Sequence, residues 1–226
     1  MSPSGVMDYD KLEHALRDGS APGDPREAVA GALDEIASGK RDLRAVQHPL
    51  GFLCLPLVRD GERGVCVHLF GSGTGAEPTA APPVHAHSWE LRSHVLYGRV
   101  ANVPVRVREE ASKPTHRVFE VHSDPTGVDE LRPTERLVHS ERGPEHTSSG
   151  GETYTLPAGE FHSTLVSRDE PAATLVLGLS LPGRSDLILG PLQGHGHSTV
   201  RRLCGAGHTQ RTARAALRRV HGDQRE

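Results

Sequence analysis

Short apolar runs rich in β-branched residues, separated by turn-forming residues, occupy most of the sequence after His48. Gly, Pro, Asp and Ser gather between the runs, as at 123–127 and 148–151. We expect strands at 50–58, 64–70, 92–109 (with a break at 102–104), 116–122, 135–140, 153–155, 161–167, 172–181 and 186–189. Many short strands at near-regular spacing, in a chain with 25 glycines and 17 prolines, predict an antiparallel β-sandwich or barrel.

Helical patterns flank these strands. Apolar residues recur at helical spacing over 8–18 and again after Asp24, which can cap a helix whose first residue is Pro25 and whose end lies near Gly39. A third pattern covers 209–220, within a basic C-terminal tail. We expect this last helix to pack on its own domain rather than on an acidic partner.

The chain therefore divides into three predicted parts. Residues 1–47 form a helical extension that packs on the barrel, 48–190 form the barrel, and 191–226 form a connector and the basic helix. A length of 226 residues suits one domain with such extensions.

Composition excludes several classes of function. The formal net charge of −3 offers no basic surface for nucleic acid. No apolar run approaches the roughly 20 residues that span a bilayer, and the N-terminus lacks the features of a signal peptide. Cys54, Cys66 and Cys204 form an odd, sparse set without metal-binding spacing. We expect a cytoplasmic protein without nucleic-acid or membrane partners.

Two histidine-bearing stretches, 84–98 and 151–162, carry the chemistry. His85 and His87 lie two residues apart, so on a strand they share a face and can chelate a metal, and His162 from a distant strand would complete the site. With 15 histidines in the chain, a chance His-x-His pair is the alternative. His195 and His197 form a second such pair, which we expect at the surface because no third ligand follows at a suitable spacing.

These stretches resemble the paired motifs of the cupin superfamily. The first motif runs Gly, five residues, His-x-His, three or four residues, Glu, six residues, Gly; His85, His87 and Gly98 fit it, while Thr79 replaces its first Gly. The second motif runs Gly, five residues, Pro-x-Gly, two residues, His, and is matched by Gly151, Pro157, Gly159 and His162. The resemblance implies a mainly β fold, a cupin double-stranded β-helix (jelly-roll) barrel with short N-terminal helices and a C-terminal helix.

The family's glutamate falls at Leu91, with Glu90 one residue too early. On strict alternation Leu91, Ser93, Val95 and Tyr97 face the interior of the barrel, whereas Glu90, Arg92 and His94 face outward; a one-residue bulge reverses this order. The predicted metal shell is therefore His85, His87 and His162. Glu90 is the candidate fourth ligand, and His94 is expected to be a hydrogen-bonded histidine on the outer face.

A three-histidine shell resembles that of the thiol dioxygenases related to cysteine dioxygenase, and this likeness covers about 26–182. The Ser, His and Tyr relay of that group is not matched, because the corresponding positions are Thr174, Val176 and Gly178. Its substrate-binding arginine on the first barrel strand is also missing, since residues 53–55 are Leu, Cys and Leu. The likeness implies a shared architecture rather than shared thiol chemistry.

Three neutral imidazoles leave coordination positions open, and iron(II) in such a site can bind substrate and O2 together. Our leading hypothesis is a mononuclear non-heme iron(II) oxygenase or dioxygenase of a small polar metabolite. A thiol dioxygenase is one alternative. Others are a redox-neutral isomerase, lyase or hydrolase with zinc, manganese, nickel or copper, and a non-catalytic cupin that binds a small ligand. The cupin resemblance also leaves a homodimer through outer strands open.

Further side chains are candidates for the site. Glu160, two residues before His162, is either a general base, a partner that orients an imidazole, or a rim charge. Tyr97 and Tyr154 could hydrogen-bond substrate, with core packing as the alternative. The candidates for the substrate pocket are His68, Trp89 and Ser93, and the favoured alternatives are a structural histidine for His68 and a core or rim aromatic for Trp89.

Overall fold

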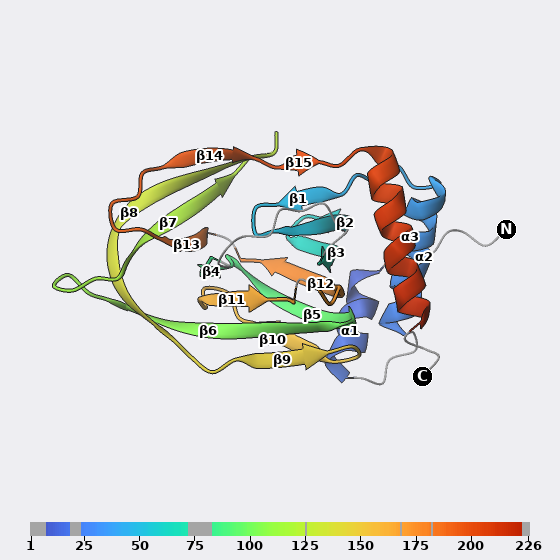
Figure 1. Ribbon diagram of the computed structural model, residues 1–226, viewed down its shortest axis with the longest axis horizontal. Coiled ribbons are helices and arrows are strands. Elements are labelled where there is room, and N and C mark those ends of the chain that lie inside the picture. The colour runs from blue at the N-terminus through green and yellow to red at the C-terminus, as the bar shows by residue number, and fades with distance from the viewer. Residues whose placement is uncertain are drawn as a thin grey trace.

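The computed structural model describes residues 8–18, 24–71, 83–124, 126–167, 169–181 and 183–222. The protein is mainly β, with two antiparallel sheets, two N-terminal helices and one C-terminal helix in the described ranges (Figure 1). The predicted mainly β class, with helices before and after the strands, is therefore confirmed. Thr79, where the first motif departs from its pattern, lies outside the described residues.

The first sheet has seven strands. Their order is β10 (Thr153–Leu156), β5 (Trp89–Tyr97), β12 (Ala172–Ser180), β3 (Arg63–Phe70), β2 (Phe52–Asp60), β1 (Val46–His48) and β15 (Arg202–Leu203).

The second sheet has eight strands. Their order is β14 (His197–Val200), β8 (Val128–Arg142), β7 (His116–Ser123), β13 (Asp186–Gly190), β4 (His85–Ala86), β11 (His162–Leu165), β6 (Arg99–Glu109) and β9 (His146–Ser149), and β8 also pairs with β6.

The helices are α1 (Tyr9–Asp18), α2 (Pro25–Ser38) and α3 (Ala206–Gly222). The Asp24 carboxylate caps α2 by accepting a hydrogen bond from the Arg26 backbone N–H at 2.9 Å, and Gly39 ends the helix at a φ of 78°. Both features were predicted. None of the helices in the described ranges is long and apolar enough to cross a membrane.

The main hydrophobic core lies between the helices and the seven-stranded sheet, with α2 and α3 side by side in Figure 1. Alternation on β2 and β3 sends every second residue to this core. The buried members from these strands and helices include Leu33, Leu53, Leu55, Val65, Val67, Ala213 and Val220. The basic C-terminal helix thus packs on its own domain, as expected.

Two expectations about the strands are wrong. The break in 92–109 falls at Gly98 rather than at 102–104, because Gly98 turns the chain with a φ of 76° while Pro104 continues β6. The segment after Gly190 is not a simple connector, since its residues form β14 and β15, which pair with β8 and β1.

A bulge in β5 changes the direction of Tyr97. Val95 pairs with Thr174 and Tyr97 pairs with Ala173, so Leu96 is an extra residue in the ladder. Tyr97 consequently packs in the helix-side core, with the Arg219 guanidinium 5.9 Å from its ring centroid. The expectation that Tyr97 faces the interior between the sheets is therefore wrong.

Candidate metal centre

The three predicted histidines meet between the sheets. His85 opens β4, His87 directly follows it, and His162 opens β11, where it pairs with His85 across the two strands. A nitrogen of each ring lies within 4.8 Å of those of the other two. The backbone N–H of Gly159 donates to the His87 carbonyl at 2.8 Å, so the turn of the second motif is bonded directly to the first.

Two of the imidazole rings are oriented by a hydrogen bond from Nδ1 to a backbone carbonyl oxygen. Nδ1 of His85 lies 3.0 Å from the Pro83 carbonyl oxygen, and Nδ1 of His162 lies 3.1 Å from that of Glu160. Each Nδ1 must carry the proton and donate, which leaves Nε2 as a lone-pair donor. Nε2 of His162 is buried and has no hydrogen-bond partner among the described residues. A metal ion would satisfy this atom, so the donor set fits a metal.

Burial keeps the site neutral. It lowers the pKa of His85 to about 4, with the neighbouring His162 as a second cause, and it also lowers the pKa of His162. The pKa of His87 is well below its usual value because of burial and then the charges of His85 and His162. Burial also lowers the pKa of His48, to about 3. Neutral imidazoles are the form that binds metal.

We expect the metal-free protein to lose stability in acid. The folded-state pKa values of His48 and His85 lie below the unfolded value of 6.5, so the unfolded chain binds more protons below that pH. Stability is full above about pH 6.5 and falls toward about pH 4, by roughly 1 kcal/mol per pH unit for each histidine. Urea unfolding of the chelator-treated protein across this range measures the slope. His48→Gln should make the slope shallower; identical slopes would contradict the assignment.

The candidate fourth ligand does not join the cluster. Glu90 is exposed on the outer face of β5, where its carboxylate lies 3.5 Å from the Arg92 guanidinium. His94 is nearly buried on the same face, and its Nδ1 lies 3.0 Å from the Thr153 hydroxyl, which matches the structural role expected for it.

The histidines open into a cavity of about 910 Å³ between the sheets. Its lining includes three further predicted residues: His68, Trp89 and Tyr154. Burial raises the pKa of the Tyr154 hydroxyl, and the neighbouring Ser93 and Asn102 side chains oppose that shift. Ser93 is fully buried beside Tyr154 rather than on the cavity wall.

The Glu160 side chain is not brought to the cavity. It is exposed and does not line the cavity, and the group of this residue that contacts His162 is the backbone carbonyl. Glu160 therefore orients an imidazole through its main chain, and the structure gives its carboxylate no contact with the cluster.

Arginines at the cavity were missed by sequence reasoning. Arg63 pairs with Asp10 at 2.9 Å and Arg201 pairs with Asp129 at 3.2 Å, whereas Arg59 has no ion pair within the described ranges. A register shift after Pro56 on β2 places Arg59 on the cavity side. Alternation counted from Cys54 assigns Arg59 to the helix side. Pro56 is the sequence signal for an irregular strand here, because proline within a sheet occurs at edges, strand starts and bulges.

The fluorescence of Trp89 can be used to follow the metal centre, because Trp89 is the only tryptophan in the chain. Its ring centroid lies 4.6 Å from that of His87, and a Cβ added at Gly178 would come within 2.7 Å of the ring. Gly178→Ala must therefore move Trp89. We expect a shifted emission maximum and weaker quenching of Trp89 by a bound paramagnetic ion. Gly31→Ala, with open space around the new methyl group, should change neither; an unaltered spectrum in Gly178→Ala would contradict the packing.

No protein-family model and no curated protein matches the chain. Among solved structures, it is similar to Streptomyces albus HEPD with 2-hydroxyethylphosphonate and Fe(II) bound (TM-score 0.36, 10% identity, 64% of this chain and 25% of that chain). It is also similar to the DMSP lyase DddQ from Ruegeria pomeroyi, with a TM-score of 0.36 and 14% identity over 81% of this chain and 78% of that chain. A third similar structure is a protein of unknown function from Ralstonia eutropha with a cupin-like fold. Its TM-score is 0.34, with 14% identity over 80% of this chain and 82% of that chain. The chain spans a quarter of HEPD, and these likenesses concern the fold alone.

Proposed function

We propose that this protein is a mononuclear iron(II)-dependent oxygenase of a small polar metabolite, with the ion held by His85, His87 and His162. The observation that carries the proposal is the buried Nε2 of His162, which has no partner among the described residues and lies with two other imidazoles at one cavity. His85, His87 and His162 would hold the ion through three neutral nitrogens, a shell that would leave coordination positions for substrate and O2. Iron(II), when bound, supplies the redox chemistry that the side chains lack.

The protein's own groups bind and orient the substrate in this proposal. Arg59 places a positive charge on the cavity lining and favours an anionic group on the substrate. Tyr154 lines the cavity, and its hydroxyl is the group on this residue that can donate a hydrogen bond or hold a proton. Trp89 covers His87 and limits access of water to that side of the centre.

The cavity wall argues against the thiol dioxygenase alternative. Val176 and Gly178, at the positions of the last two relay residues, line the cavity but carry no group that can move a proton. The Trp89 ring occupies the space beside Gly178 where the relay's tyrosine would project. The tyrosine that does line the cavity, Tyr154, comes from a different strand, β10.

Anaerobic reconstitution tests the proposal. Metal-free protein is loaded with iron(II), and oxygen uptake is followed with panels of small anionic and neutral metabolites. We expect uptake that requires both iron and one substrate class, is lost in His85→Ala and is retained in His94→Ala. Turnover with zinc or nickel in the absence of O2, together with no iron-dependent uptake, would instead establish a redox-neutral enzyme.

A further inference from the structure

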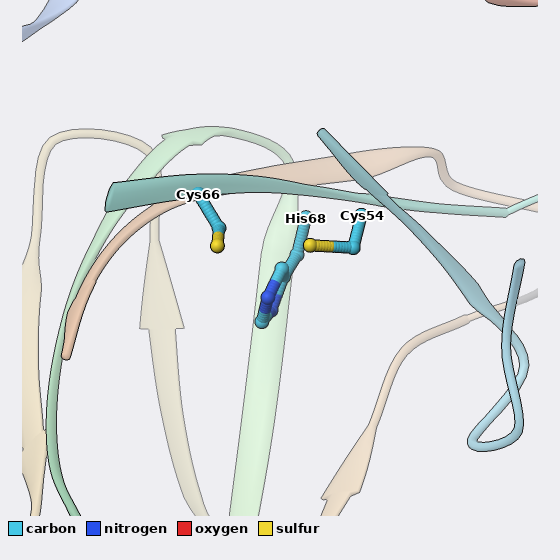
Figure 2. Close-up of side chains that lie close together, drawn as sticks. All are labelled: Cys54, Cys66 and His68. Carbon is cyan, nitrogen blue, oxygen red and sulfur yellow. The ribbon is translucent and has the colours of Figure 1, made fainter. Parts of the chain in front are cut away.

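A second group of metal-ligating side chains lies in the same cavity. Cys54 is on β2, and Cys66 and His68 are on the neighbouring strand β3. Cys54 pairs with His68, and Cys66 is two residues away on the same face. Figure 2 shows the three side chains projecting from the same side of the two strands. All three residues line the cavity, facing away from the helix-side core that takes Leu53, Leu55 and Val67.

The spacing of the three groups suits a metal ion. The two sulfur atoms and one ring nitrogen lie within 4.8 Å of one another, the same limit that the three histidines meet. Tetrahedral coordination, with metal–sulfur bonds of about 2.3 Å and metal–nitrogen bonds of about 2.0–2.1 Å, sets ligand atoms roughly 3.5–3.8 Å apart. Small side-chain rotations close that difference without a change in the strands.

Strand register disfavours a disulfide as the purpose of the pair. Both cysteines are free thiols, and they occupy diagonal positions, since Cys54 faces His68 whereas Cys66 faces Pro56. Diagonal Cα atoms in an antiparallel pair are about 7–8 Å apart, beyond the usual disulfide range of about 4.4–6.8 Å. A metal ion spans this separation, because it adds two bonds of more than 2 Å between the sulfur atoms.

The local chemistry favours a thiolate. Hydrogen bonding with Cys54, and to a smaller extent with His68, lowers the pKa of the Cys66 thiol, whereas the same bond and burial raise the pKa of Cys54. The positive charge of Arg59 acts in the same direction on Cys66. A lowered thiol pKa favours the thiolate, the form of cysteine that coordinates a metal.

We propose that Cys54, Cys66 and His68 form a second metal site, selective for zinc, on the sheet opposite the three-histidine centre. Cysteine thiolates, which form as the metal displaces the thiol protons, are soft donors that select zinc, and imidazole also suits zinc. Three imidazoles accept iron(II). His85 and His162 belong to the eight-stranded sheet, and the second group belongs to the seven-stranded one, so two ions would face a single cavity. Three protein ligands leave a fourth zinc position for water or a donor atom of the substrate.

Cobalt(II), as a spectroscopic substitute for zinc, tests the proposal on the full chain under reducing conditions. We expect metal-free protein to bind about two cobalt ions, one of which produces the near-ultraviolet charge-transfer band of thiolate coordination. Added zinc should remove that band. Cys54→Ser and Cys66→Ser should each lose the band and bind about one ion, while Cys204→Ser, which alters the buried cysteine of the helix-side core, should keep both.

His162→Ala separates the two centres, because it should retain the thiolate band while losing the other ion. Absence of the band in the wild-type protein overturns the proposal whatever the variants do. Its persistence in both Cys54→Ser and Cys66→Ser overturns it as well. Neither result bears on the three-histidine centre, whose metal binding is measured by stoichiometry in the same titrations.

Discussion

Replacement of His162 by alanine should weaken iron(II) binding at the three-histidine centre by more than about 100-fold, the upper end of what is lost when only a supporting group is removed. The substitution removes one of three nitrogens and leaves two, which chelate from a single short strand segment. It also removes the buried Nε2 that has no hydrogen-bond partner among the described residues. In the metal-free variant, removal of this unsatisfied nitrogen offsets part of the cost of the vacated volume and of the lost Nδ1 hydrogen bond to the Glu160 carbonyl, so we expect a folded protein with a modest loss of stability. Isothermal titration of metal-free protein with iron(II) measures the affinity.

His94→Ala is the matched control. Its ring is nearly buried in the stretch that follows His85 and His87, but it lies on the outer face and contacts Thr153. We expect this variant to lose some stability, through the unpaired Thr153 hydroxyl and the vacated volume, while retaining wild-type affinity for iron(II). Equal loss of affinity in the two variants would show that the histidine stretch acts through the fold rather than by coordination.

Motif spacing correctly predicted that His85, His87 and His162 meet, because turn residues position the strands that carry them. The turn at Gly159, with a φ of 83°, delivers His162 opposite His85, and its N–H reaches the His87 carbonyl. Strict alternation also predicted that Leu91 faces the cavity and that His94 faces outward. These features depend only on local geometry, which the sequence specifies.

Alternation failed where a strand carries an extra residue. The bulge at Leu96 turns Tyr97 toward the helices, and the one after Pro56 turns Arg59 toward the cavity. Pro56 indicates an irregular strand but does not fix which residue is extra, and no such residue precedes Leu96, so the reversal of faces follows from tertiary packing. Two extra residues, one in each strand, thus removed a predicted site residue and added an unpredicted one.

The group of Cys54, Cys66 and His68 could not be predicted from the sequence for a different reason. Cys54 and Cys66 are not at a spacing typical of zinc-binding loops, and they become neighbours only through the register of the β2–β3 hairpin. That register places Cys54 opposite His68, which no count along the chain determines. Cross-strand ligand sets of this kind require the strand pairing to be known first.

Gly98→Ala should be the most destabilising small substitution in the first motif, costing about 3 kcal/mol or more. Gly98 has a φ of 76°, where an alanine is strained by roughly 1–2 kcal/mol. An added Cβ would also lie 2.5 Å from the Pro171 carbonyl oxygen and 2.8 Å from Ala172 Cα, both backbone atoms that cannot rotate away. The Gly98 carbonyl accepts a hydrogen bond from Gly150 at 3.0 Å, which ties the end of the first motif to the start of the second.

Gly61→Ala isolates the steric part of this loss. Gly61 also has a positive φ, of 56°, but no atom lies within 4 Å of its added Cβ, so only the backbone strain of roughly 1–2 kcal/mol applies. Urea unfolding midpoints with unchanged m-values give both free energies. A larger loss in Gly98→Ala means that close packing of the β5–β6 turn against β12 holds the two motifs together, and through them the three histidines. Equal losses of stability in the two variants would show that Gly98 is needed only for its backbone conformation and not for close packing.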